Sequence, residues 1–447
     1  MTYLVPEKLK ELASIFRRNG YSLFLVGGAV RDYILGSENH DFDFTTDAEP
    51  MEVKAMFPRT IDTGIKHGTV TVLYKGGSYE ITTFRTEGDY SDSRHPDSVK
   101  FVRSLDEDLK RRDFTINALA ADLFSGEIIG RHRGLEDLKD GIIRAIGKPE
   151  ERFGEDALRM MRAARFAAKL GFTIESETLK AMATLHENIK AVSEERIHDE
   201  LFKLIGSPSP RVGLEALRTT GLMAMILPEL EKCYDCSQDG YHNETVYEHQ
   251  ILALEKATKE HYPMEVKIAA LFHDLGKVQT KKEGDGHFTY YGHELVSEKL
   301  VKQILTRLKS SNQTRDDVAL LVREHMFAYS SEWSDGAVRR FMNRVGLSYL
   351  EMLFQLRECD KAGTTGALPD SSTEEAELKA RIQAEMEKNA ALSLKDLLVN
   401  GKDMMALGLK GQAIGKTLNA LLDIVIENPE ENTKETLLQK AREINSL

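Results

Sequence analysis

Asp41 and Asp43, near the N-terminus, are the first residues whose types and spacing suggest chemistry. Residues two apart on a strand project from the same face, so both carboxylates could hold a hard cation such as Mg²⁺. Earlier in the chain an apolar run ends at Gly27 and Gly28, where backbone N–H groups can approach an anion without a Cβ in the way. The stretch predicts a metal-dependent nucleotide site. A surface turn with two solvated aspartates is the alternative.

A third carboxylate lies in a predicted hairpin. Residues 68–74 and 79–84 are two β-branched runs separated by the sequence KGGS, which is typical of a hairpin turn. Glu80 comes early in the second run, where its side chain could stand beside Asp41 and Asp43. A solvent-facing glutamate is the alternative. Together, these segments predict a small mixed sheet with a helix.

Acidic and basic residues alternate along a predicted helix over residues 150–171. Asp156 and Arg159 are three apart, and Arg162 and Arg165 continue the same stripe. The aspartate can accept from the exocyclic amino group of cytosine or adenine while the arginine donates to the ring acceptor. Guanine and uracil present the reverse pattern, so they would be refused. A salt bridge on a solvated helix face is the alternative.

The segment of residues 109–121, LKRRDFTINALAA, places Arg112 and Asp113 just before a predicted helix. Such a cluster could bind a triphosphate and ribose hydroxyls, and a capped helix with a charged start is the alternative. The polar residues 85–99 lack periodicity and contain breakers, which predicts a mobile loop. A later helix, over residues 193–205, is expected to brace the acid–base helix described above.

A second group of potential ligands lies in the middle of the chain. Imidazoles and carboxylates at this frequency, in helical and partly apolar segments, are typical of metal sites. The residues are His249, His273, Asp274, His293, His325 and Asp360. One such histidine would usually be structural, but the recurring series predicts a divalent-metal site. Cys233 and Cys236 form a single CxxC, too few ligands for a closed zinc site, and we expect them to be packing residues.

Length and composition limit the remaining possibilities. A chain of 447 residues is too long for one core, so several domains are expected. No apolar run reaches about 18 residues and the first 20 lack the core of a signal peptide, which predicts a cytoplasmic protein without a membrane partner. A formal net charge of −12 argues against a generally basic nucleic-acid binder. It still permits a basic groove on an acidic body.

Successive motifs resemble those of class II tRNA nucleotidyltransferases, the CCA-adding enzymes and their poly(A) polymerase relatives. They read GGAVRD, DFD, RRDFTINAL, EDALRMMRAARFA and EERIHDEL, in that order. The H, HD, H, H, D series is similar to the HD phosphohydrolase superfamily, a module that some bacterial members carry. The GKDMMALGLKG stretch resembles the tail of the same enzymes. One departure is Ala157, where the family usually has a proline that favours a helix start, so its loss should matter little to specificity.

The resemblance implies an α+β fold with four parts. A small mixed-sheet head similar to DNA polymerase β would occupy residues 1–130. A mostly helical neck with nucleotide-base recognition would follow over 131–230, then an HD body over 231–365 and a helical, tRNA-binding tail over 366–447.

The resemblance also implies roles for the acidic and glycine residues of the head. Gly28 and Arg31 would contact the incoming triphosphate. Asp41 and Asp43 would bind two Mg²⁺ ions, and Glu80 would be the third catalytic carboxylate.

The remaining site residues are assigned in the same way. Phosphate, ribose and base would be held by Arg112, Asp113, Asp156, Arg159, Arg162 and Arg165, with Asp156 and Arg159 selecting CTP and then ATP. A further divalent metal in the HD module would be held by His249, His273, Asp274 and Asp360, with His293 and His325 as supporting or second-metal ligands.

The implied activity is template-independent addition of CCA to the 3′ end of tRNA from CTP and ATP, by two-metal phosphoryl transfer. Addition of A or of CC alone, or poly(A) synthesis, is the alternative within the transferase class. Phosphohydrolysis of nucleotides or 2′,3′-cyclic phosphates by the HD module, as the main activity, is a third hypothesis. The loop over residues 86–98 is expected to help switch the pocket from cytosine to adenine.

Overall fold

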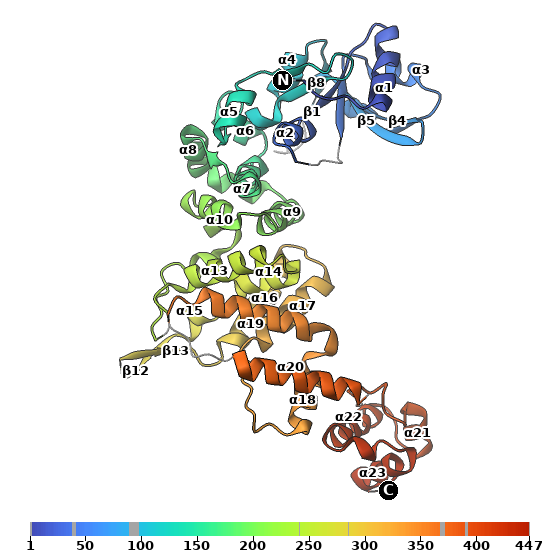
Figure 1. The fold of residues 1–447 in the computed structure, drawn as a ribbon, viewed down its shortest axis with the longest axis vertical. Coiled ribbons are helices and arrows are strands. Elements are labelled where there is room, and N and C mark those ends of the chain that lie inside the picture. Colours follow the sequence, from blue (N-terminus) through green and yellow to red (C-terminus); the bar gives the residue numbers. More distant parts are fainter. Residues whose placement is uncertain are drawn as a thin grey trace. The chain divides into compact units, whose positions relative to one another are not determined.

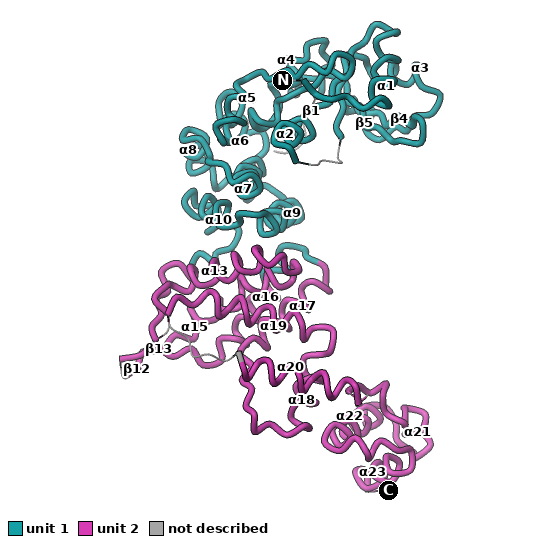
Figure 2. The backbone as a smooth tube through the Cα atoms, in the orientation of Figure 1, with its two compact units in different colours: residues 1–232, 304–310 teal, residues 233–303, 311–447 magenta. Residues whose placement is uncertain are grey.

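The computed structural model describes residues 2–37, 42–88, 98–240, 242–284, 286–366, 372–388 and 392–446. Asp41 and most of the predicted loop over 86–98 therefore lie outside the described residues. The chain forms two compact units, shown in Figure 2: residues 1–232 with 304–310, and residues 233–303 with 311–447. The predicted division into four domains stays a prediction.

A seven-stranded sheet forms the N-terminal part of the first unit (Figure 1). Its strand order is β3-β4-β5-β2-β1-β8-β9, and all neighbours are antiparallel except β2 and β5, which are parallel. The strands are β1 (Leu23–Val26), β2 (Asp43–Thr46), β3 (Thr60–Gly64), β4 (Thr69–Tyr74), β5 (Gly77–Thr83), β8 (Leu119–Asp122) and β9 (Ile128–Gly130). The predicted α+β class with a mixed sheet is confirmed.

The predicted hairpin is present and is tighter than expected. In the pairing of β4 with β5, Tyr74 lies opposite Gly77, so the turn consists of Lys75 and Gly76 alone. Both turn residues have positive φ, 46° and 75°, the conformation of a two-residue turn that matches the twist of the flanking strands. This turn fixes the register that points Glu80 to one face of the sheet.

Short helices and a two-stranded ribbon surround the sheet. Helix α1 (Glu7–Arg18) buries Leu9, Leu12, Ala13 and Phe16, the stripe expected from its helical spacing. The others are α2 (Gly28–Ile34), α3 (Pro50–Met56), α4 (Leu105–Lys110) and α5 (Gly134–Asp140), and the ribbon pairs β6 (Arg85–Glu87) with β7 (Val99–Phe101). The ends of the predicted polar loop are thus strands.

The prediction of a helix after Asp113 is wrong. Only a 3₁₀ turn, Thr115–Asn117, follows, and the chain then enters strand β8. Leu119, Ala120 and Ala121 are fully buried beside β1. Burial between two strands outweighs the helix propensity of leucine and alanine.

The single helix predicted over 150–171 is in fact two helices, α6 (Pro149–Glu155) and α7 (Leu158–Leu170). Asp156 breaks it with an extended backbone, φ −148° and ψ 105°, and its Oδ1 accepts from the Leu158 amide at 3.1 Å. Ala157 has φ −63°, the value that a proline would impose. Ala157 therefore has the backbone that a proline would favour, and the expectation that its presence matters little to specificity stays a prediction.

Helices complete the first unit. They are α8 (Ser176–Leu185), α9 (Glu194–Ile205), α10 (Pro210–Thr219), α11 (Leu222–Ile226) and α12 (Pro228–Glu231), with a small parallel pair β10 (Ile142–Ile143) and β11 (Thr173–Ile174) beside them. Helices α9 and α10 both pack on α7. The prediction that the helix over 193–205 braces the acid–base helix is confirmed.

The second unit is almost entirely helical. Its first elements are α13 (Val246–Lys259), α14 (Met264–Phe272), α15 (Lys277–Thr280), β12 (Lys282–Gly284), β13 (His287–Thr289), α17 (Asn312–Glu324) and α18 (Asp335–Val345). Helix α16 (His293–Arg307) begins in this unit and its last residues belong to the first. Then follow α19 (Leu350–Gly363), α20 (Ser372–Glu387), α21 (Gly401–Ala406), α22 (Gln412–Glu427) and α23 (Lys434–Asn445).

The C-terminal helices have a core of their own, built from Leu421, Val425 and Leu437 among others. Helix α22 runs through Gly415 without a break. Across the described part of the chain, no helix combines the length and the apolar character that crossing a bilayer requires.

All three cysteines lie in the second unit, and each is a buried free thiol. Burial raises the pKa of Cys233 and Cys236, and it raises that of Cys359 to about 12. The burial of Cys233 and Cys236 agrees with their expected role in packing.

Candidate functional site

Two of the three predicted carboxylates stand side by side on the sheet. Strands β2 and β5 are parallel, with Phe44 opposite Ile81, so the preceding residues Asp43 and Glu80 occupy neighbouring positions on the same face. Both are exposed, whereas Phe44 and Ile81 are buried. The third, Asp41, lies outside the described residues. The described pair offers adjacent oxygen donors of the type that Mg²⁺ prefers.

Arg112 faces the glycine turn next to these carboxylates. A Cβ placed on Gly27 would lie 3.1 Å from Arg112 Nη1, so the turn and the guanidinium are in close contact. Gly28 begins α2 directly after this turn. Burial lowers the pKa of Arg112, and the negative charges of Asp108 and Asp43 oppose this shift. A cation thus lies against the glycine turn and interacts with the charge of Asp43, one carboxylate of the pair.

Arg31 is held inside the protein. It is 3% exposed, donates from Nε to Asp32 at 2.7 Å, and donates from Nη1 to Asn117 Oδ1 at 2.6 Å. Its guanidinium also lies over the Phe166 ring, 5.1 Å from the centroid. These contacts hold the Arg31 side chain of α2 against the 3₁₀ turn and α7.

Asp113, which lies between α4 and the 3₁₀ turn, is bound to α7 through Arg162. Its Oδ2 accepts from Arg162 Nε at 2.8 Å and Nη2 at 2.6 Å, while Oδ1 accepts from Asn117 at 3.0 Å. Burial alone would raise the pKa of Asp113, but the charge and hydrogen bonds of Arg162, with the bond from Asn117, lower it to about 2. The ionised carboxylate therefore fixes one face of the Arg162 guanidinium.

Asp156 and Arg159 each have their own fixed partner. Arg196 of α9 grips the Asp156 carboxylate with two hydrogen bonds, at 3.2 and 2.7 Å. Arg159 donates to Glu155 and, at 3.1 Å, to the Arg152 carbonyl oxygen. The two side chains are therefore held by neighbours on α6 and α9.

Glu200 of α9 holds the other two arginines of the stripe. It is 5% exposed, accepts from Arg165 Nε, and lies 3.8 Å from Arg162 Nη1. Arg162 thus lies between two carboxylates, those of Glu200 and Asp113. The two α9 residues Arg196 and Glu200 position both ends of the predicted base-reading stripe.

The histidine and aspartate series comes together in the second unit around Asp274. His249 and His273 place Nε2 at 3.4 and 3.3 Å from its Oδ2. His293 and His325 place Nε2 at 3.1 and 3.8 Å from its Oδ1. All six predicted residues belong to this cluster, since Asp360 Oδ1 lies 3.1 Å from His249 Nε2.

The Asp274 carboxylate is buried and ionised. Burial would raise its pKa, but Lys277, 2.7 Å away, and His273 hold that pKa well below its usual range. Neither oxygen has a hydrogen bond of good geometry within the described residues. Two carboxylate oxygens without such a hydrogen bond, facing four imidazoles, fit a divalent cation. Asp274 belongs to two possible metal-binding groups, one with His249 and His273 and one with His293 and His325.

Three of the imidazoles are oriented by backbone carbonyls. Because a carbonyl oxygen only accepts, each Nδ1 carries a proton and each Nε2 faces Asp274. The Nδ1-to-oxygen distances are 2.9 Å from His273 to Ala270, 2.9 Å from His293 to Tyr290 and 2.6 Å from His325 to Val322.

A cavity of about 750 Å³ opens onto this cluster. Besides Asp274 and Asp360, its lining includes the basic side chains of Lys277, Arg357 and Lys361. The arrangement combines potential metal ligands with groups that attract an anion.

Sequence reasoning missed two of the residues around this cluster. Lys277 follows Asp274 by three positions, a helical spacing that could have identified it. Glu244 lies 3.7 Å from His249 Nδ1, but it is held by Thr365, 121 positions away, and nothing local in the sequence indicates this.

Comparisons with known proteins agree with this geometry. Family models match residues 23–144 (Poly A polymerase head domain), 171–234 (Probable RNA and SrmB-binding site of polymerase A) and 288–441 (tRNA nucleotidyltransferase domain 2 putative). The first covers the sheet that carries Asp43 and Glu80.

Curated relatives and solved structures that resemble this chain include several CCA-adding enzymes. The CCA-adding enzyme of Enterococcus faecalis is 36% identical over 98% of this chain and 97% of its own length. That of Lactobacillus johnsonii is 57% identical over 45% of this chain, a match that spans about half (51%) of the relative's length. The Bacillus stearothermophilus CCA-adding enzyme in complex with CTP is 33% identical with a TM-score of 0.73, over 98% of this chain and 97% of that one. The chain belongs to the CCA-adding enzymes, a family of tRNA nucleotidyltransferases.

Proposed function

We propose that this chain adds CCA to the 3′ end of tRNA from CTP and ATP without a nucleic-acid template. Its family membership supports this function. The structural observation that carries it is the pairing of Asp43 with Glu80 beside Arg112 and the glycine turn.

The head residues would hold the reacting groups. Mg²⁺ bound by Asp41 and Asp43 would stabilise the attacking and leaving oxygens of an in-line displacement. Glu80, next to Asp43 on the sheet, would orient the terminal tRNA hydroxyl as the third carboxylate. Arg112 and the backbone at Gly28 would hold the triphosphate. The predicted contact of Arg31 with the triphosphate stays a prediction, and its observed partners make it a support for Asn117.

Base selection would come from α7 and the residue before it. Asp156 would accept from the exocyclic amino group and Arg159 would donate to the ring of cytosine or adenine. Arg196 and Glu155 hold these two side chains in advance. Asp113 would bind the ribose. Arg162 and Arg165 would complete the pocket, and Glu200 holds both of these arginines in place.

The products of a tRNA that ends at its discriminator base test this proposal. With CTP alone we expect two added nucleotides, and with CTP and ATP three. Addition of A only, of C only, or of a long A tract would support the alternative transferases instead.

Incorporation that survives both Asp41→Ala and Asp43→Ala would contradict the metal assignment, and unchanged refusal of GTP and UTP by Asp156→Ala and Arg159→Ala would contradict the base assignment. With tRNA as substrate, the site of action would be the cytoplasm.

A second activity is favoured by the cluster around Asp274. A divalent ion held there by His249, His273, Asp274 and Asp360, with a second on the His293 and His325 side, would supply Lewis-acid activation of water and of a phosphoester. Lys277, Arg357 and Lys361 would hold the phosphate in the cavity. The HD-type module would then hydrolyse nucleotides or 2′,3′-cyclic phosphates.

Hydrolysis of a 2′,3′-cyclic nucleotide, with metal content measured on the same samples, tests this second activity. We expect His273→Ala to lose bound metal and hydrolysis while nucleotide addition persists. If the wild-type protein binds no metal at this cluster, the second activity is wrong and the cluster serves only as a helical scaffold.

A further inference from the structure

His249 differs from the other three imidazoles of the Asp274 cluster. Its Nδ1 atom is buried and has no hydrogen-bond partner among the described residues. The helix explains the difference. His273 and His325 directly follow the last residues of their helices and His293 begins one, so each of these rings reaches a carbonyl near a helix end, whereas His249 lies inside α13. Carbonyls inside a helix are already used by its own N–H groups.

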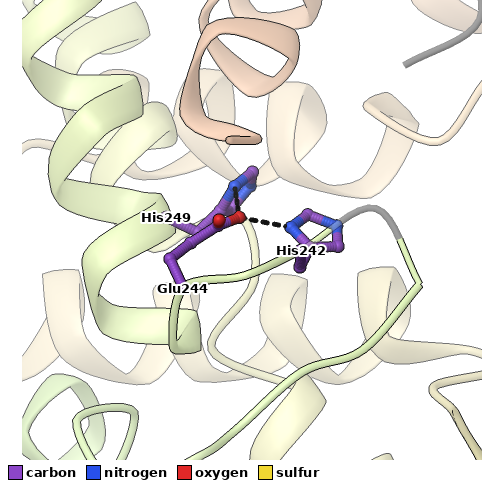
Figure 3. A group of neighbouring side chains, drawn as sticks. All are labelled: His242, Glu244 and His249. Carbon is purple, nitrogen blue, oxygen red and sulfur yellow. Dashed lines mark hydrogen bonds and ion pairs between the residues drawn. The ribbon is translucent and has the colours of Figure 1, made fainter. Parts of the chain in front are cut away.

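The Glu244 carboxylate lies near His249 Nδ1, the atom that lacks a backbone carbonyl acceptor. Figure 3 shows its carboxylate between the rings of His249 and His242, reached by each from a different side. The Oε1 atom lies 3.7 Å from His249 Nδ1 and 2.6 Å from His242 Nδ1. The side chain is 3% exposed. Glu244 faces Nδ1 of His249, because the other ring nitrogen, Nε2, points to Asp274 and Asp360.

The second carboxylate oxygen fixes this position. Oε2 accepts from the Asn243 amide at 3.0 Å, from the Thr365 amide at 3.3 Å and from the Thr365 hydroxyl. Thr365 follows the end of α19, the helix that carries Asp360. A Cβ on Gly363 would lie 2.7 Å from the His249 carbonyl oxygen, so the end of α19 is packed directly against His249. One carboxylate thus ties His249 to the segment that presents Asp360.

The three residues His242, Glu244 and His249 could also be read as a metal site of their own. The contact between His242 Nδ1 and Glu244 Oε1, at 2.6 Å, argues against this. It is a short hydrogen bond, and two atoms in direct contact leave no room for an ion about 2.0–2.2 Å from each at tetrahedral angles. Glu244 therefore acts as a hydrogen-bond acceptor.

We propose that Glu244 is a positioning residue for the metal centre around Asp274. Its negative carboxylate, 3.7 Å from Nδ1 of His249, favours a proton on that atom and so holds the tautomer and ring orientation that direct Nε2 at the cation. Carboxylate, histidine and metal form such a series in many metal sites. This inference rests on the proposed metal centre, and it adds a residue that makes no contact with the ion.

Cobalt binding by the full-length protein tests the proposal. Co²⁺ is titrated into the apo protein, and affinity, stoichiometry and the visible absorption bands are recorded for wild type, Glu244→Gln and Glu244→Ala. We expect an affinity about 10- to 100-fold weaker in both variants, with shifted bands because His249 no longer binds in its wild-type orientation. Glu265→Gln, which removes a carboxylate elsewhere in the same unit, is the matched control and should bind as wild type does.

The outcomes separate the two ideas. If Co²⁺ binding is the same in wild type and His273→Ala, the metal centre itself is wrong. If His273→Ala loses Co²⁺ but both Glu244 variants keep wild-type affinity and bands, the positioning role is wrong and the centre stands. Loss of one whole equivalent of Co²⁺ in Glu244→Gln would make Glu244 a ligand and also overturn the proposal. Glu244→Gln keeps the side chain's volume, so a result remains available if Glu244→Ala does not fold.

Discussion

Single ion pairs decide where the proposed substrate-binding side chains point, and Asp113 is the clearest case. Its folded-state pKa of about 2 lies below its ordinary value of 3.8. The stabilisation from ionised Asp113 is therefore fully present above pH 3.8, and it is lost as the pH falls through 2. The shift corresponds to about 2 kcal/mol.

We therefore expect Asp113→Asn to lower the free energy of unfolding by about 2 kcal/mol at pH 7. The difference from wild type should shrink to about half of that at pH 3. Denaturant unfolding at both pH values measures it. Asp140→Asn, at an exposed position, is the control. A difference that stays constant with pH would show that the Asp113 pKa is not shifted.

Arg196 offers a second test at this scale. Replacing it with methionine removes both hydrogen bonds to Asp156 while that carboxylate stays in place. We expect discrimination against UTP and GTP to fall about tenfold, the equivalent of about 1.4 kcal/mol, because Asp156 is no longer held in its base-reading orientation. Misincorporation by single-turnover assays measures this. Lys190→Met, which removes an exposed charge, should leave it unchanged, and equal discrimination in both variants would argue against a positioning role for Arg196.

At the residue scale, the sequence predicted side chains better than it predicted their partners. The histidine and aspartate series was recognisable because its spacing follows helices, and all six residues do meet. Their orientation depends on carbonyls freed at helix ends and, for His249, on Glu244. The partner of Glu244 lies 121 positions away, and such a pairing leaves no local pattern to detect.

Among the elements, α18 and α22 are joined by one buried arginine. Arg339 donates from Nε to the Ile426 carbonyl and from Nη2 to the Glu427 carbonyl at 2.9 Å, at the end of α22. Its Nη1 lies 2.7 Å from Glu385 of α20, and both side chains are under 10% exposed. Three helices thus share one cation, and it also satisfies carbonyls that a helix end leaves free.

We expect Arg339→Met to destabilise the second unit by about 3 kcal/mol, because Glu385 and two carbonyls lose their buried partner. The adjacent Arg340 provides a matched control. It pairs with Glu427 but is 55% exposed, so Arg340→Met should cost about 0–1 kcal/mol. Thermal or denaturant unfolding of both variants measures the difference. Similar losses in the two would mean that the buried arrangement contributes little.

Helices and strands could be predicted from the sequence where neighbouring residues alone determine their conformation. The β4–β5 hairpin followed from β-branched runs around glycines, and its two-residue turn needs residues that accept positive φ. Strand β8 was mistaken for a helix because Leu-Ala-Ala-Asp favours helix locally, and only the neighbouring strand makes it extended. The break at Asp156 was missed because the pattern of apolar residues continues through it.

For the whole molecule, the net charge of −12 sets how tRNA must be held. Contact with phosphates would have to come from a basic groove on an acidic body. Binding through such contacts releases counterions, so we expect tRNA affinity to fall tenfold or more between 50 and 200 mM salt. Filter binding or anisotropy measures this, with binding of CTP alone as the comparison. An affinity that hardly changes with salt would mean that phosphate contacts are few.

The placement of the cysteines gives the molecule an internal reporter. The three thiols are buried, their pKa values are raised, and all lie in the second unit. A thiolate is the reactive form, so a maleimide or disulfide reagent should modify the folded protein very slowly. Because the sequence has no other cysteine, any rapid labelling reports opening of the second unit and never of the first. The rate of alkylation in the native buffer would thus measure the local opening of one half of the chain without any engineered probe.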